Sequence, residues 1–196
     1  LAVARAQRAH TARLLVETGA DVNAIGGDGK SALALAIFNG HYALASYVID
    51  NGADVNRPDA LGFTPLFWAV DRRNMEKGRN GFPWLVTEDP LPLISKLLDA
   101  GADVNVAVND TPRSRLRAGT PRIVFASALM RAAFAGDLEL SKLLLSHGAD
   151  PHAVSSDGES MLEAASGLAR ISGFQAERPD SERLELVKLL VELGED

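Results

Sequence analysis

The sequence contains no cysteine, and aromatic residues make up only 6% of it. The absence of cysteine excludes disulfide bonds and thiolate metal sites. No apolar run reaches the roughly 20 residues that a membrane-spanning helix needs. The net charge of −6 argues against nonspecific binding to nucleic acid. We therefore expect neither a membrane nor a nucleic acid as the partner of this chain.

The sequence is rich in apolar aliphatic residues, and it contains a repeated motif. The chain has 196 residues, of which 46% are apolar, which is enough to bury a substantial core. GADVN begins at Gly19, Gly52 and Gly101, GADPH at Gly148 and GED at Gly194. The first two copies are 33 residues apart, and the later intervals are 49, 47 and 46 residues. The intervals indicate a 33-residue repeat that carries three insertions.

Each repeat predicts two helices. The first helix begins at a hydroxyl residue that can accept a hydrogen bond from an amide of the first turn. These residues are Ser31, Thr64, Ser127 and Ser160, and an alanine that allows close packing follows each by five residues, at Ala36, Ala69, Ala132 and Ala165. The second helix is apolar at helical spacing and ends at the glycine of the repeated motif.

The 33-residue period, the segment TPLFWA at Thr64 and the GADVN turn resemble the ankyrin repeat. The resemblance implies an all-α solenoid of stacked helix-turn-helix repeats with β-turn finger loops, forming one domain over residues 1–196. We expect repeats near residues 1–25, 26–58, 59–107, 108–154 and 155–196, the first of them partial. Because the chain begins at Leu1 and not at Met, we expect that an upstream segment with any targeting signal has been removed.

The same resemblance implies a noncatalytic protein–protein interaction module. We expect another protein as partner, no cofactor and a monomeric chain. In the ankyrin family, partners usually bind the concave side, which consists of the finger tips and the exposed edge of the first helices. The repeat register places Phe38, Leu61, Phe63 and Phe134 there as an apolar strip, with Arg72 among the flanking charges. Such a strip is typical of an interaction patch.

The insertions lie near residues 72–90, 106–122 and 167–183. The second insertion lengthens a finger loop and is basic. Its only acidic residue is Asp110, and its basic residues are Arg113, Arg115, Arg117 and Arg122. Arginine makes forked contacts with carboxylates and phosphates, so this basic finger could bind an acidic partner. Two alternatives stay open: a solvated loop whose arginines pair with the acidic body, or a finger that folds back over the apolar strip.

The segment AIGGDGKS, residues 24–31, resembles a phosphate-binding loop. A phosphate loop needs a buried strand before it and a helix whose N-terminal amides face the anion. No apolar strand precedes this segment, and the same register recurs at residues 59 and 155 without the Gly-Lys pair. We therefore predict an ordinary turn that does not bind a nucleotide.

His147, Asp150 and His152 are close enough in sequence to suggest a metal site. Asp150, however, occupies the turn position that Asp21, Asp54 and Asp103 hold in other repeats without histidine neighbours. We predict a turn residue here, and neither a metal site nor a catalytic site in the chain.

Two other functions remain open at this stage. A small anionic ligand could bind between the basic finger and Arg72. Alternatively, the chain could be an architectural spacer, which predicts apolar, uncovered faces at both ends of the stack.

Overall fold

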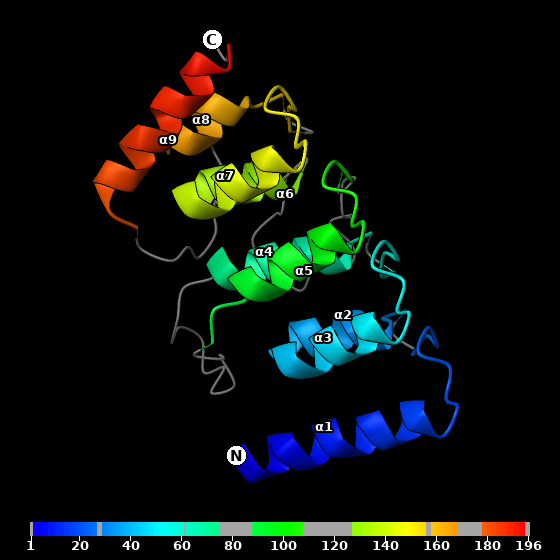
Figure 1. Cartoon of the computed structure of the whole chain (residues 1–196). Helices are drawn as coiled ribbons and strands as arrows, with labels where there is room; N and C mark the ends of the chain where they lie inside the picture. Colours follow the sequence, from blue (N-terminus) through cyan, green and yellow to red (C-terminus); the bar gives the residue numbers. More distant parts are fainter. Residues whose placement is uncertain are drawn as a thin grey trace, which may run out of the picture. The chain divides into compact units, whose positions relative to one another are not determined.

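A computed structural model describes residues 2–26, 29–60, 62–74, 88–107, 127–155, 158–167 and 178–194. Within these ranges the regular elements are helices, and the backbone pairing outside them is a single antiparallel bridge between Ile25 and Ser31. The helices are α1 (Ala2–Glu17), α2 (Ala32–Phe38), α3 (Tyr42–Asp50), α4 (Pro65–Asn74), α5 (Leu91–Asp99), α6 (Ala128–Ala135), α7 (Leu138–Ser146), α8 (Met161–Ser166) and α9 (Asp180–Glu192), as Figure 1 shows. The all-α prediction is confirmed.

The chain divides into two compact units, and each is described by itself. Unit 1 consists of Leu1–Arg72 and Phe82–Ala102, and unit 2 of Arg73–Gly81 and Asp103–Asp196. In unit 1, α3 packs against α2, α1 and α5. In unit 2, α6 packs against α7 and α8, and α9 packs against both α7 and α8. Stacked helix pairs of this kind are the predicted solenoid architecture. The limits of the repeats and insertions stay predictions.

The four predicted helix starts are confirmed. The hydroxyl oxygens of Ser31, Thr64, Ser127 and Ser160 each accept a hydrogen bond from the amide three residues later, at 3.1–3.3 Å. At Ser160 the arrangement is reciprocal, because the Glu163 carboxylate also accepts from the Ser160 amide at 2.8 Å. Each hydroxyl satisfies an amide that has no partner inside its helix, which stabilises the helix by about 1 kcal/mol.

The core of each unit consists of aliphatic side chains, with few aromatic ones. The four alanines that follow the helix starts are at most 3% exposed, so the first helices of the repeats approach their neighbours closely. The largest fully buried side chains are Leu33, Ile37, Leu66, Phe67, Ile94 and Leu97 in unit 1 and Leu129, Met130, Leu140, Leu144, Met161 and Leu186 in unit 2. Burial of each such side chain contributes about 1.5–3 kcal/mol.

The repeated Gly-Ala-Asp turns are linked to one another by asparagine side chains. Asn23 donates to the carbonyl of Gly52 at 3.0 Å and accepts from the amide of Asp54 at 2.8 Å. In unit 2, Asn105 makes the same pair of bonds to Gly148 and Asp150, both at 2.9 Å. These bonds fix the spacing between successive repeats.

Asp150 is a turn residue, as predicted. Its carboxylate accepts a hydrogen bond from the amide two residues later, at 2.9 Å. The aspartates Asp21, Asp54 and Asp103 do the same at 2.8–2.9 Å.

Hydrogen bonds join the described residues of the phosphate-loop-like segment, which are 24–26 and 29–31. The Gly26 amide donates to the Lys30 carbonyl, and the Gly29 amide donates to the Gly26 carbonyl, both at 3.0 Å. Gly29 has a φ of +76°, and a Cβ atom there would lie 2.7 Å from the Cβ atom of Ala60 in the next turn. Both the positive φ and the close approach require glycine. The fold therefore requires glycine at position 29, and no bound phosphate is needed to explain it.

Candidate functional site

An aromatic cluster in unit 1 is formed by residues of α2, of α4 and of the turn before α4. The rings of Phe38 and Trp68 meet edge to face, with centroids 5.1 Å apart. Trp68 in turn meets Phe63 at 5.0 Å, and Phe63 stacks on Phe67 at 5.2 Å. Phe63 and Phe67 are 2% exposed, whereas Phe38 and Trp68 are half-buried. The cluster therefore has a buried base and an accessible rim, which Phe38 and Trp68 form.

Two cations lie on this rim. The guanidinium carbon of Arg72 is 4.3 Å from the centroid of the Phe38 ring. The Lys30 Nζ atom is 5.8 Å from the Phe38 centroid and 5.9 Å from the Trp68 centroid. All three distances fall within the range of cation–π attraction. Arg72 follows Trp68 by four residues on α4, which places the two side chains on one helix face.

Asp59 holds the rim in place. Its side chain is fully buried; one carboxylate oxygen accepts from the Phe63 amide and the other from the Trp68 indole, both at 3.1 Å. The second oxygen is also 3.7 Å from Lys30 Nζ. A single carboxylate thus fixes the turn before α4, the indole ring and the lysine of the preceding turn. We call Lys30, Phe38, Asp59, Trp68 and Arg72 the rim site.

Burial alters the acid–base properties beside the rim site. It raises the pKa of Tyr42 from 10.0 to about 12, an effect that the Arg72 charge opposes and that Asp89 and Glu88 reinforce. Burial also lowers the pKa of Arg72, against the stabilising charges of Asp71 and Tyr42. Arg72 nevertheless remains cationic, because a guanidinium is not deprotonated in proteins.

A shallow, open groove adjoins the rim site at Asp59. It has a volume of about 520 Å³ and lies between two successive turns of unit 1. Ile25, Gly29, Asp54, Asn56, Arg57, Pro58, Asp59 and Ala60 line it. The groove extends the accessible surface from the aromatic rim toward the finger turns.

The structure brings together three of the residues predicted to contact a partner. Phe38, Phe63 and Arg72 all belong to the aromatic cluster or its rim. The expectation that Phe63 and Phe134 are exposed is wrong, because they are 2% and 4% exposed and form part of the cores of units 1 and 2. The register gives a residue's place in the repeat, but not whether its side chain points inward.

The other predicted contact residues, Leu61, Arg113, Arg115 and Arg117, lie outside the described residues.

Trp68 and Asp59 were not predicted as site residues. Trp68 lies within TPLFWA, which was interpreted only as a helix start. Asp59 stands five residues before the capping Thr64, where Ser155 stands before Ser160. Ser155 likewise accepts an amide hydrogen bond, from Glu159 at 3.0 Å. The sequence signal for the Asp59–Trp68 pair is therefore a polar residue at this position of the turn, followed by a tryptophan nine residues later.

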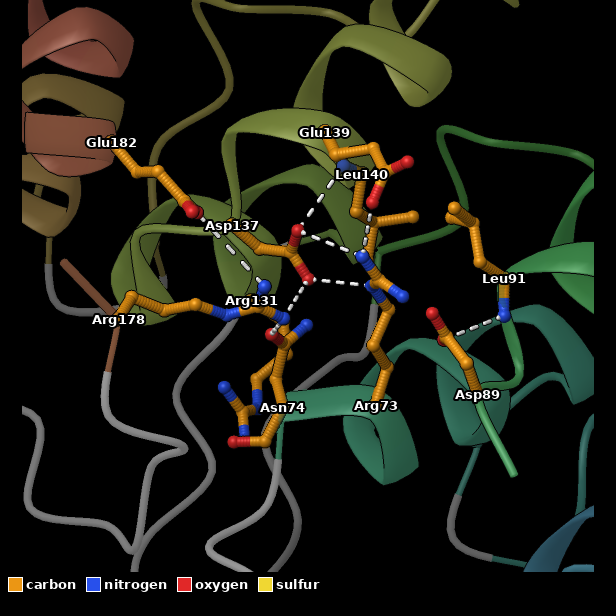
Figure 2. A network of polar contacts seen from close by, with 10 residues as sticks. All are labelled: Arg73, Asn74, Asp89, Leu91, Arg131, Asp137, Glu139, Leu140, Arg178 and Glu182. Carbon is orange, nitrogen blue, oxygen red and sulfur yellow. Dashed lines mark hydrogen bonds and ion pairs between the residues drawn. The ribbon is translucent and has the colours of Figure 1, made fainter. Parts of the chain in front are cut away.

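Unit 2 contains a buried network of arginine and carboxylate side chains (Figure 2). Asp137 is fully buried and accepts from Arg73 Nε at 2.8 Å, from Arg178 at 2.7 Å and from the Leu140 amide at 3.2 Å. Arg73 also donates to Glu139 at 2.7 Å. The Asp137 carboxylate therefore forms ion pairs with two arginines and also caps the N-terminus of α7.

The network also includes the end of α4. Arg131, 3% exposed on α6, donates to the backbone carbonyl of Asn74 at 3.0 Å, and Arg178 is 3.5 Å from the Asn74 side-chain oxygen. Asn74, within the first predicted insertion, is the last described residue before position 88, and Arg178, within the third, is the first described residue after position 167. The network thus anchors the edges of two insertions to α6 and α7. The charged side chains of this network bind one another, so we assign the network a role in stabilising the fold.

The described residues provide no metal centre. None of their His, Asp and Glu side chains gather in threes as a metal ion would require. His147 Nδ1 lies 3.0 Å from the Leu143 carbonyl, and Asp150 serves its turn. None of the described helices is long and apolar enough to cross a membrane.

Comparison with known protein families agrees with the geometry. A model of three ankyrin repeats matches residues 1–107, and a model of the single ankyrin repeat matches residues 126–156. The chain belongs to the ankyrin repeat family. Ankyrin repeats are generally protein–protein interaction modules and are typically noncatalytic, and no catalytic domain is identified in this chain. The unmatched residues between the two segments overlap the predicted basic finger.

The chain is similar to several known proteins of different size. It is 26% identical over 201 aligned residues to the putative ankyrin repeat protein YahD of Escherichia coli, covering 90% of this chain and 86% of YahD. It is 32% identical over 133 residues to the ankyrin repeat and KH domain-containing protein mask of Drosophila melanogaster. It is 30% identical over 150 residues to leucine-rich repeat serine/threonine-protein kinase 1 of Caenorhabditis elegans.

These alignments cover 68% and 75% of this chain but span only 3% and 6% of the Drosophila and Caenorhabditis proteins.

Proposed function

We propose that this chain is a noncatalytic module that binds another protein through the rim site. The observation that carries the proposal is the stacking of Arg72 on Phe38, beside the half-buried edge of Trp68. Tryptophan and arginine are the residues that most often contribute the binding energy of protein interfaces. Here both are half-buried and held in place before a partner arrives.

Preorganisation supports the proposal. Trp68 is held by its bond to the buried Asp59, and Arg72 by its contact with Phe38. Ordering a long side chain at an interface costs about 0.5–1.5 kcal/mol, and a side chain already ordered avoids most of that cost. The rim site therefore presents two anchors that lose little entropy on binding.

The basic finger belongs to the same proposal as a second contact. Arg113, Arg115 and Arg117 would select a partner with acidic groups, because forked arginine contacts favour carboxylates. Reversal of all three charges to glutamate is expected to weaken partner capture and to leave folding intact. Cooperative unfolding of this triple variant at a much lower temperature would instead make the finger a structural element.

The test begins with affinity capture of partners from a source lysate, followed by calorimetry with the purified partner. Phe38→Ala and Arg72→Ala are each expected to weaken binding by about tenfold or more, the effect of losing an interface anchor. Lys142→Ala, on the exposed side of α7, is the control and should bind like the original chain.

A partner that binds Phe38→Ala, Arg72→Ala and the original chain equally would contradict the proposed surface. Thermal unfolding of each variant separates lost binding from lost folding.

A further inference from the structure

The last helix of unit 2 is apolar on two faces. Leu186 and Leu190 are fully buried on one side of α9. Leu184 and Val191, on another face, are 54% and 53% exposed, with Val187 half-buried between them. Residues spaced by three and four positions lie on one side of a helix, so these three form a continuous stripe. In a stack of repeats, an apolar face of this kind is normally covered by a neighbouring repeat.

A comparison of α9 with α7 indicates what would cover this stripe. The segment LELSKLLL in α7 aligns without gaps with LELVKLLV in α9, so that Leu138, Ser141 and Leu145 occupy the positions of the exposed stripe. In α7 these residues are half-buried or buried, and α9 packs against α7. The stripe on α9 is therefore the face that a following helix of the same kind would cover.

The first helix of unit 1, α1, also has an uncovered apolar residue. It lies on the face that a preceding helix would cover. Leu14 stands five residues before the helix-ending glycine, the position that Tyr47 holds in α3. Tyr47 faces α1, because its hydroxyl is 3.5 Å from Glu17 and its ring lies 5.3 Å from the Arg13 guanidinium. This position thus faces the preceding helix. On α1, Leu14 is 51% exposed, and within the described part of unit 1 no helix covers it.

The net charges of the two helices favour pairing of α9 with α1 over pairing of α9 with itself. By sequence, α9 has four acidic residues and two basic ones, a net charge of −2. The sequence of α1 has three arginines and one glutamate, a net charge of +2 with histidine neutral. Two copies of α9 would repel each other, whereas α9 and α1 attract.

We propose that α9 of one molecule docks on α1 of a second copy, so that the helix stack continues from one molecule to the next. Leu184, Val187 and Val191 would cover Leu14, as α7 and α9 cover each other within the chain. The contact is head-to-tail, so each molecule keeps one free face and chains of molecules can grow. The proposal concerns a surface separate from the rim site, and it replaces the expectation of a monomer.

Sedimentation velocity over a concentration series, up to about 1 mM because a single helix face gives weak binding, tests the association. The original chain should increase in mean mass with concentration, and less so at high salt, because salt screens the attraction between the two helices. Leu14→Glu and Val191→Glu should each remain monomeric. Val154→Glu places a charge at another exposed apolar residue and should associate like the original chain.

Mixing the two variants gives the decisive result. Leu14→Glu keeps its α9 face and Val191→Glu keeps its α1 face, so an equimolar mixture should form dimers and stop there. A mixture that stays monomeric, an original chain that stays monomeric at every concentration, or a Leu14→Glu variant that dimerises alone would each overturn the proposal. Circular dichroism verifies that the variants are folded.

Discussion

Arg73 Nε lies 2.8 Å from Asp137 Oδ2, and the two side chains are 6% and 0% exposed. Removing one partner from a buried ion pair leaves a buried charge without compensation, which costs more than the pair itself contributes. Asp137 is also the N-cap of α7 and the partner of Arg178. This carboxylate therefore pairs with Arg73, pairs with Arg178 and caps α7.

Asp137→Ala is expected to lower the free energy of unfolding by about 3–5 kcal/mol, because two arginines lose their buried counter-charge. Urea unfolding measures the loss. Glu139→Gln is the control: Glu139 also binds Arg73, but its side chain is 67% exposed, so the loss should stay below about 1 kcal/mol. Equal effects of the two substitutions would show that the buried pair contributes nothing special.

Arg183 connects the ends of two helices in unit 2. Its guanidinium donates to the carbonyl of Ala165 at 2.7 Å and to that of Phe134 at 3.3 Å, near the C-termini of α8 and α6. Arg183→Ala should destabilise the chain by about 1–3 kcal/mol, because helix-end carbonyls lose a charged donor. Arg183→Lys should recover only part of the loss, since lysine lacks the fork.

Thermal unfolding of both Arg183 variants tests this role, with Lys188→Ala on the exposed side of α9 as the control. An Arg183→Ala variant as stable as the control would contradict it.

The helix starts and turns could be predicted from the sequence because they are local and repeated. Ser31 binds an amide three residues away, and Asp150 an amide two residues away. Such bonds depend on a few adjacent residues, and several copies of the same pattern reinforce one another. The fold class followed from the same repetition, since stacked repeats bury what one repeat cannot.

The buried polar network of unit 2 could not be predicted in this way. Arg73 and Asp137 are 64 residues apart in sequence, and Arg131 and Asn74 are 57 apart. Each contact occurs once and involves residues at the edges of insertions, where the repeat register no longer applies. The burial of Phe134 escaped prediction for a related reason: its position in the repeat is half-buried at Phe38 and at Asp71, but Phe134 is only 4% exposed.

Asn105 is expected to stabilise the packing of repeats in unit 2. It donates to the Gly148 carbonyl and accepts from the Asp150 amide. Asn105→Ala should cost about 1–2 kcal/mol for two hydrogen bonds at a partly solvated turn. Asn105→Asp keeps the acceptor but loses the donor, so about half of that loss is expected. Urea unfolding of the three chains measures both effects, and an unchanged midpoint for Asn105→Ala would argue that water replaces the bonds without cost.

Tyr42 should titrate far above an ordinary tyrosine. Its pKa is about 12 in the folded chain, raised from 10.0, because burial disfavours the phenolate and the nearby Asp89 and Glu88 add to that effect. The folded state then holds a proton that the unfolded state has lost. The stabilising contribution is complete below pH 10 and is lost as the pH rises through about 12.

The chain has two tyrosines, so Tyr47→Phe leaves Tyr42 as the single reporter. The tyrosinate absorbance of this variant is expected to rise with a midpoint near 12 while the chain is folded, and near 10 in urea. Adding Glu88→Gln should lower the folded midpoint, because a charge that disfavours the phenolate is removed. A folded midpoint near 10 would mean that Tyr42, beside the rim site, is open to water in the folded chain.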